Sequence, residues 1–259
     1  MGDEPFVLME QMTSKEIRDS VASGFRTAII PMGSIEAHGE HLPINTDSVV
    51  SRHLAEMVAN RLGKTLVAHT LPLGHAPRTQ FPGTISISVD TVLDVLRAYL
   101  GALQRDGFDT VVLIPMHAEN FQTLALFSPM LAMEFPVLKL IPSLDVASMI
   151  ERRNTIAAKY KITGDQAGWH AGAAETSEML AIDPDLVRMP DARRGYLGPS
   201  GFGRLLPETL RDGWYVLDPH GVMGDPTRSK AEFGHDVLSG LADDLASLVR
   251  DATRGTRQE

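Results

Sequence analysis

The chain of 259 residues contains no cysteine. This absence excludes disulfide bonds, thiolate metal ligands and a cysteine nucleophile, so any bound metal must be held by histidine, aspartate and glutamate. A run of basic residues is also missing, and the formal net charge is −9. Without such a run the chain lacks the positive surface that neutralises phosphates, which argues against a nucleic-acid partner.

Long apolar stretches are missing as well. No segment approaches the roughly 18 consecutive apolar residues of a membrane span. The acidic start, Met1–Pro5, lacks the apolar region of a secretory signal. Hydrophobic residues make up 43% of the chain and charged residues 22%, which are ordinary values for a globular protein. The sequence therefore predicts a soluble, cytoplasmic protein with one domain over residues 1–259.

Strand and helix patterns alternate along most of the chain. Apolar runs predict strands at 27–30, 66–71, 85–87, 110–114, 137–141 and 214–217. Amphipathic periodicity predicts helices at 14–22, 48–61, 89–105, from 121 onward, and at 144–160, 173–182 and 230–251. Residues 162–172 are expected to form a loop, and residues 188–212 an irregular excursion rather than a domain boundary. The alternation predicts an α/β fold with a mostly parallel central sheet and helices on both faces.

The densest group of reactive side chains follows the first predicted strand. Glu36, His38, Glu40, His41 and Asp47 lie within twelve residues, in a loop that also contains Gly and Pro. In extended backbone, alternate side chains point the same way, so Glu36 and His38 can converge while His41 points away. Asp47, at the head of the next helix, can return to the same point. This mixed oxygen and nitrogen set suits Zn²⁺ or Mn²⁺; the alternative is a polar loop whose Asp47 only caps a helix.

A second pair follows the strand predicted at 110–114. His117 and Glu119 are two residues apart at a strand exit, so both side chains can face one point. Alone, the pair could simply hydrogen-bond to neighbouring backbone. Ligands of parallel α/β sheets bind beyond the carboxyl ends of the strands, where the first loop also lies. The shared edge therefore favours metal ligation.

The third cluster contains His170 and Glu175. A histidine next to an aromatic residue, here Trp169, on a mobile loop can serve both as a proton shuttle and as part of a lid. Glu175 falls in the first turns of a predicted helix, where the helix dipole favours a carboxylate. Helix-terminus chemistry alone would therefore also explain Glu175.

Taken in order, these motifs resemble the creatininase (creatinine amidohydrolase) family of metal-dependent amidohydrolases. The resemblance covers nearly the whole chain and rests on residues 33–43 with Asp47, Phe81-Pro-Gly-Thr84, His117-Ala-Glu-Asn120, His170-Ala-Gly172 with Glu175, and residues 221–226. It implies a three-layer α/β/α sandwich. It also implies a homo-oligomer, commonly a hexamer, in which residues 188–212 are a plausible contact element.

The resemblance further implies two divalent metal ions, Zn²⁺ or Mn²⁺, that share one aspartate. One ion would take Glu36, Asp47 and His117, and the second would take His38, the bridging Asp47 and Glu119. Many relatives carry His-Gly-Gly-Asn where this chain has His117-Ala-Glu-Asn120, and there a carboxylate that matches Glu175 is the natural substitute. Because this chain has both carboxylates, the choice between Glu119 and Glu175 stays open.

The chemistry implied is hydrolysis of a small cyclic amide or related C–N substrate such as creatinine. Water activated by the two metals would attack the carbonyl carbon, and His170 would donate a proton to the departing nitrogen. Glu175 is the alternative proton donor. The same metal site could instead serve a formamide, a lactone, or a cyclic ketone derived from a sugar or inositol. A non-enzymatic metal-binding protein would keep the ligands but would not need His170.

Overall fold

The computed structural model describes residues 8–198 and 211–254 and confirms the α/β class. Within these ranges, four parallel strands form one sheet in the order β2-β1-β3-β4. The strands are β1 (Thr27–Met32), β2 (Thr65–Val67), β3 (Thr110–Pro115) and β4 (Lys139–Pro142). All six residues of β3 are buried, as expected for a parallel strand that is covered on both faces.

Helices account for most of the remaining described chain. The α-helices are α1 (Ser14–Ala22), α2 (Thr46–Leu62), α3 (Val89–Asp106), α4 (Ala118–Glu134), α5 (Val146–Lys159), α6 (Gly164–Ala167), α7 (Ala173–Ile182) and α9 (Ala231–Thr253). Short 3-10 helices lie at Met9–Gln11, Pro184–Leu186, Met189–Asp191, Trp214–Val216 and Pro226–Arg228. Among the described residues, no helix has the length and apolar character needed to cross a membrane.

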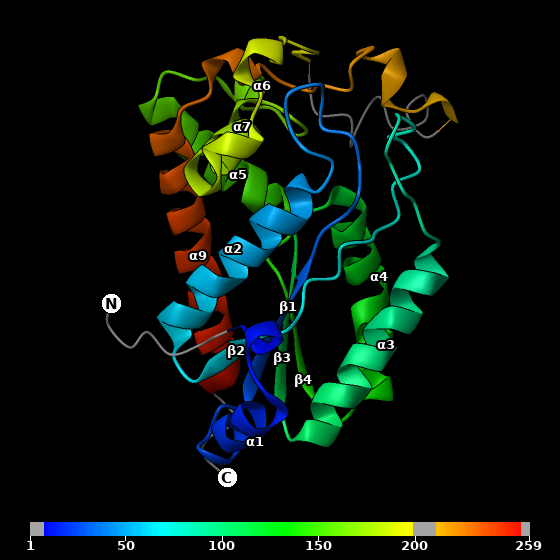
Figure 1. Ribbon diagram of the computed structural model, residues 1–259, viewed down its shortest axis with the longest axis vertical. Coiled ribbons are helices and arrows are strands. Elements are labelled where there is room, and N and C mark those ends of the chain that lie inside the picture. Colours follow the sequence, from blue (N-terminus) through cyan, green and yellow to red (C-terminus); the bar gives the residue numbers. More distant parts are fainter. Residues whose placement is uncertain (1–7, 199–210, 255–259) are drawn as a thin grey trace.

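Helices cover both faces of the sheet (Figure 1). Ile29 of β1 and Val112 of β3 face an apolar core that they share with α2, α5, α7 and α9. Their neighbours Ile30 and Leu113 face a second core that is formed with α3 and α4. This alternation along the strands gives the three-layer α/β/α sandwich that the family resemblance implies.

Two predicted strands are absent from the sheet. The strand predicted at 214–217 is wrong, because Trp214–Val216 is a 3-10 helix that follows Gly213 at φ 74°. Residues 85–87 form only isolated bridges, in which Ile85 pairs with Ile35 and Ser86 with Gly74. Neither segment pairs with a neighbouring strand over enough residues to form a ladder. Apolar composition alone was therefore insufficient to predict a strand in these two segments.

Several element boundaries also differ from expectation, and one helix was not predicted. β2 ends at Val67 rather than at Leu71, and α6 lies inside the segment predicted as loop, where Thr163 starts the helix with a capping box. Helix α4 begins at Ala118, three residues before the predicted start. This last difference matters for the site, because it places Glu119 on a helix. Residues 199–210 of the excursion predicted at 188–212 lie outside the described residues.

The first loop of the site is pressed tightly against helix α2. A Cβ at Gly33 would lie 2.3 Å from Ser48 Oγ, so only glycine fits where the chain leaves β1. The Gly33 amide donates to the carbonyl oxygen of Leu71, and its carbonyl oxygen accepts from Asn120 Nδ2 at 2.9 Å. These contacts fix the exit of β1 against α2 and α4, which carry two of the predicted site residues.

We expect Gly234→Ala to destabilise the fold. Helices α7 and α9 cross at Gly234, where a Cβ would lie 1.9 Å from the backbone oxygen of Ser177. The helices would have to separate, so the free energy of unfolding should fall by about 1–3 kcal/mol or more in a denaturant titration. Gly101→Ala in α3 is the control: its Cβ would meet only Phe135 at 3.8 Å, and it should stabilise by about 0.5–1 kcal/mol. Equal effects of the two variants would contradict this account.

Candidate metal centre

Three of the predicted site carboxylates lie in the first turns of three helices. Asp47 belongs to α2, Glu119 to α4 and Glu175 to α7. A helix N-terminus carries a partial positive charge, which stabilises a carboxylate there. Helices α2 and α4 follow the carboxyl ends of β1 and β3, so their N-termini meet at one edge of the sheet. The fold thus brings together acids that are far apart in the sequence.

The seven predicted site residues are all buried: Glu36, His38, Asp47, His117, Glu119, His170 and Glu175. The most exposed of them, Glu175, has 7% relative exposure. Buried ionisable groups must be paired with one another or with metal ions, because an isolated buried charge is very costly. Their mutual distances therefore indicate what the site can bind.

Glu36, Asp47 and His117 form a first group that could hold an ion, with ligand atoms within 4.8 Å of one another. His117 Nδ1 lies 3.1 Å from Glu36 Oε1 and 3.2 Å from Asp47 Oδ2. The other ring nitrogen, Nε2, donates to the carbonyl oxygen of His75 at 3.0 Å. That bond leaves Nδ1 without a proton in the neutral ring, as a metal ligand requires.

His38, Asp47 and Glu175 form a second group of the same kind. His38 Nε2 lies 3.2 Å from Asp47 Oδ1 and 3.8 Å from Glu175 Oε2. Its Nδ1 donates to the backbone oxygen of Glu36 at 3.1 Å, which directs Nε2 into the site. Asp47 thus offers Oδ2 to the first group and Oδ1 to the second, the arrangement expected of a bridging ligand.

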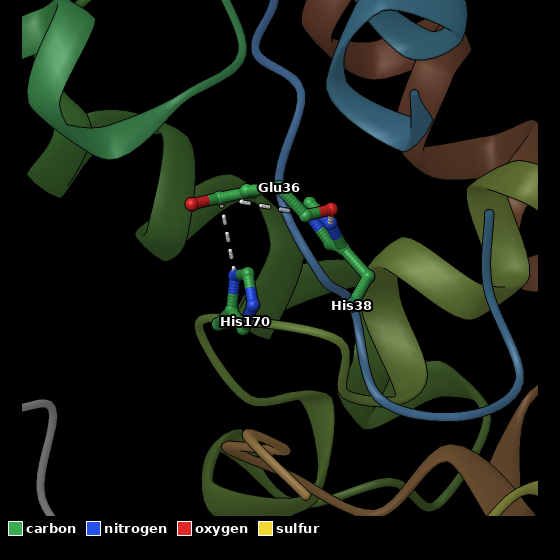
Figure 2. A group of neighbouring side chains, drawn as sticks. All are labelled: Glu36, His38 and His170. Carbon is green, nitrogen blue, oxygen red and sulfur yellow. Dashed lines mark hydrogen bonds and ion pairs between the residues drawn. The ribbon is translucent and has the colours of Figure 1, made fainter. Parts of the chain in front are cut away.

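His170 completes a third group with Glu36 and His38 (Figure 2). Its Nδ1 lies 3.6 Å from Glu36 Oε1, and its Nε2 donates to the carbonyl oxygen of Ala37 at 2.9 Å. The ring lies between those of His38 and Trp214, each with its centroid 4.3 Å away. These contacts fix the orientation of His170 and turn its unprotonated nitrogen toward the acids.

Glu119 is close to His117 but belongs to none of these three groups. Its Oε1 accepts from Arg78 Nε at 2.8 Å, and Arg78 Nη2 lies 2.7 Å from the same oxygen. Its Oε2 lies 3.2 Å from His117 Nε2, the ring nitrogen on the side away from Asp47, and makes no hydrogen bond among the described residues. The carboxylate that lies beside His38 and Asp47 is therefore that of Glu175, not that of Glu119.

Several residues that support the site had no clear signal in the sequence. Ser34 Oγ donates to Asp47 Oδ2 at 2.8 Å, and the hydroxyl of Thr79 donates to Glu36 Oε2. Arg78 and Arg153 are buried beside Glu119 and Glu175 respectively. The motif around Phe81 marked the loop that carries Arg78 and Thr79 but not their roles. Nothing in the periodicity of α5 marked Arg153.

His41 lies apart from the three groups, in agreement with its predicted direction. Its Nε2 pairs with Thr176 Oγ1 at 2.8 Å. Burial, together with the nearby His38 and His170, lowers the pKa of His41 to about 4. A neutral histidine with this partner braces the first loop against α7.

The acids give the two central histidines unusual proton affinities. Burial alone would lower the pKa of His38, but the carboxylates of Asp47, Glu175 and Glu36 raise it to about 10. The pKa of His117 is likewise raised well above its ordinary value, by Glu36 and Glu119 among others. The negative charges that hold protons on these rings would also attract metal cations to the same position. The carboxylate oxygens and imidazole nitrogens fit Zn²⁺ or Mn²⁺.

Comparisons with known proteins identify the family of the chain. A family model described as creatinine amidohydrolase (Creatininase) matches residues 10–249. A mycofactocin precursor peptide peptidase from Mycobacterium ulcerans (strain Agy99) is 29% identical, covering 90% of this chain and 88% of its own length. A 3-dehydro-scyllo-inosose hydrolase from Thermotoga maritima is 28% identical, and the alignment covers 95% of this chain and 83% of that protein. A creatinine amidohydrolase from Pseudomonas putida is 29% identical, and the alignment covers 70% of this chain and 74% of that protein.

Solved structures agree on the fold. A structure described as "Creatininase Mn" superimposes with a TM-score of 0.78 at 24% identity, over 95% of this chain and 98% of its own. A structure described as "E122Q mutant creatininase, Zn-Zn type" gives a TM-score of 0.77 at 23% identity, and the superposition covers 96% of this chain and 98% of that one. These likenesses support the α/β/α fold over nearly the whole chain.

We expect the metal-free protein to lose stability as the pH rises from about 6.5 to about 10. The pKa of His38 is about 10 in the fold against an ordinary value of 6.5, so folding favours its protonated form. That contribution is complete below pH 6.5 and disappears as the pH passes 10, and His117 acts in the same direction. Urea denaturation in chelator across this window measures the effect. His38→Gln should flatten the slope, and a stability that increases over the window would contradict the account.

Proposed function

The chain belongs to the creatininase (creatinine amidohydrolase) family, and from this premise we propose that it is a metal-dependent hydrolase of C–N bonds in amides. The substrate class that we favour is a small cyclic amide such as creatinine. The observation that carries this proposal is the pair of buried donor groups that share Asp47. Two adjacent cation sites with a common carboxylate are typical of enzymes that activate water against a carbonyl.

We assign Glu36, Asp47 and His117 to one ion, and His38, Asp47 and Glu175 to the other. This assignment replaces Glu119 by Glu175 at the second ion, because Glu175 lies beside His38 and Asp47 whereas Glu119 is bound by Arg78. When bound, divalent ions supply the Lewis acidity that polarises a carbonyl oxygen and lowers the pKa of water. The protein supplies the orientation of the ligands and a buried site.

His170 is the proton carrier in this proposal. Burial lowers its pKa, so the ring is neutral near pH 7, and its Nε2 is already bonded to the carbonyl oxygen of Ala37. Its Nδ1 can therefore take a proton from the attacking water as the new C–O bond forms. The same nitrogen can then deliver that proton to the departing amine as the C–N bond breaks. His170 thus acts first as a base and then as an acid, and Glu175 is left free to serve as a ligand.

A cyclic ketone derived from an inositol is the second candidate substrate. It is favoured by the 3-dehydro-scyllo-inosose hydrolase, which aligns with 95% of this chain. Formamides, lactones and peptide bonds would also place a carbonyl carbon at the same point, and the relatives that are named as peptidases extend the list to peptides. The amide class needs a proton on its leaving nitrogen, which gives His170 a defined task.

We also propose that the protein is a homo-oligomer, with a hexamer favoured. Leu126 and Met133 on α4 are 73% and 83% exposed, and Val137, just beyond the helix, is 66% exposed. Large apolar side chains gathered on one exposed face are typical of a surface that is covered in an assembly. A cytoplasmic location likewise stays a prediction.

We expect the purified protein to carry about two divalent ions per chain and to lose its activity in chelator. Metal analysis should be combined with an activity screen of the metal-loaded protein on cyclic amides, formamides, lactones and cyclic ketones. Asp47→Ala should be the most damaging ligand variant, because Asp47 belongs to both groups. Glu40→Ala, on the exposed part of the same loop, is the control and should keep both metal and activity. Full activity without bound metal would overturn the proposal.

We expect His170→Ala to keep both ions and most of its affinity for substrate while kcat falls by about 10²–10⁴-fold. The substrate should have a basic leaving nitrogen, for which proton delivery matters most. Loss of one ion would instead make His170 a ligand, as its group with Glu36 and His38 allows. An unchanged kcat would assign proton transfer to another group. Metal analysis beside steady-state kinetics separates these outcomes.

A further inference from the structure

Behind Glu175 lies a second buried carboxylate that the proposed reaction does not use. Glu178 is one turn along α7 from Glu175 and is fully buried. Between the two carboxylates lies the guanidinium of Arg153, from α5, which is also buried. One cation thus faces two acids, and only one of these acids belongs to the candidate metal centre.

Arg153 is shared unequally between the two acids. Its Nε donates to Glu178 Oε1 at 2.8 Å and its Nη2 to Glu178 Oε2 at 2.7 Å, the paired geometry in which arginine binds carboxylates most strongly. Only Nη1 is directed at Glu175, and its distance to Oε1 is a long 3.4 Å. Glu178 therefore neutralises most of the charge of Arg153.

This arrangement leaves one oxygen of Glu175 available to the metal centre. Glu175 Oε2 accepts from the Ala171 amide at 2.7 Å and lies 3.8 Å from His38 Nε2. If Glu178 carried no charge, Glu175 would be the nearest carboxylate left to a buried guanidinium. A buried cation attracts its remaining partner strongly, because water does not screen the interaction. Glu175 would then turn toward Arg153 and away from His38.

We propose that Glu178 is a positioning residue for the metal centre, which occupies Arg153 so that Glu175 stays available as a ligand. This inference rests on the proposed function, since it assumes that the centre binds divalent ions. It makes Glu178 a determinant of metal affinity although it lies outside all three donor groups.

Glu178→Gln tests the proposal, because it removes the charge and keeps the shape of the side chain. The readout is Zn²⁺ affinity, measured in competition with a chromophoric chelator on metal-free protein. We expect one ion to bind about 10–100-fold more weakly, as is usual when a residue that orients a metal ligand is lost. The ion assigned to Glu36, Asp47 and His117 should bind nearly as before.

Asp244→Asn is the matched control. Asp244 of α9 pairs with Arg152, the residue next to Arg153 on α5, through both Nε at 2.6 Å and Nη2 at 2.5 Å. This ion pair has the same paired geometry and its arginine lies on the same helix, α5, but the pair is partly exposed and includes no member of the three donor groups. The Zn²⁺ affinity of this variant should equal that of the unaltered protein, and equal weakening in both variants would overturn the proposal.

The double variant Arg153→Met with Glu178→Gln separates charge from packing. With no guanidinium to compete for Glu175, most of the lost affinity should return. A double variant that binds no more tightly than Glu178→Gln would overturn the proposal.

If Glu178→Gln does not fold, the double variant, which removes one charge of each sign, should bind Zn²⁺ within about tenfold of the unaltered protein. A loss beyond about 100-fold would mean that the pair acts by holding Glu175 in place rather than by cancelling charge.

Failure of this inference can be told apart from failure of the proposed function. Absence of Zn²⁺ binding by the unaltered protein would refute the metal centre itself, and the inference with it. Normal binding by the unaltered protein together with normal binding by Glu178→Gln would refute only the role of Glu178.

Discussion

The structure depends on the accumulation of negative charge at one edge of a parallel sheet. Because α2 and α4 follow the ends of β1 and β3, their positive N-termini meet at this edge, and α7 adds a third. Asp47, Glu119 and Glu175 occupy the first turns of these helices, and Glu36 comes from the loop after β1. The dipoles ease the burial of the acids but do not neutralise them. Arginines, protons and metal ions must do the rest.

The opposite edge of the sheet has the complementary arrangement. A cavity of about 840 Å³ lies there, with five basic side chains in its lining, and by composition it could be mistaken for an anion site. Arg26 donates to the carbonyl oxygen of Gly107, Lys64 to that of Ser23 and Arg250 to that of Arg61. These carbonyls belong to the C-terminal ends of α3, α1 and α2, where cations are favoured. Helix ends therefore account for three of the five basic residues, and these three need no ligand to explain them.

The spacing of residues predicted that Asp47 returns to the loop that carries Glu36 and His38, because this depends on a strand exit and a helix start that local sequence determines. That two ions share Asp47 was implied only by the family resemblance. The spacing failed to place Glu119 with respect to His117. Side chains that are two residues apart share a face only where the backbone is extended. Because α4 begins at Ala118, the chain turns after His117, and Glu119 meets Arg78 on the far side of the His117 ring. The contacts of Arg78 and Arg153 span 22 to 41 positions, and no local pattern encodes them.

The charges of this cluster also bear on how many ions it can hold. Five buried carboxylates, those of Glu36, Asp47, Glu119, Glu175 and Glu178, face two buried guanidinium groups, of Arg78 and Arg153. Three negative charges remain when the histidines are neutral. One divalent ion would leave the interior one unit negative, and a buried net charge of either sign is costly in low-dielectric surroundings. Two ions would leave it one unit positive, a state that favours an anion or the oxygen of a polarised carbonyl. A second ion would therefore change the sign of the net charge, so that the site would attract a polarised carbonyl oxygen instead of repelling it. The two buried arginines matter for this sign, because without them two ions would still leave the cluster one unit negative.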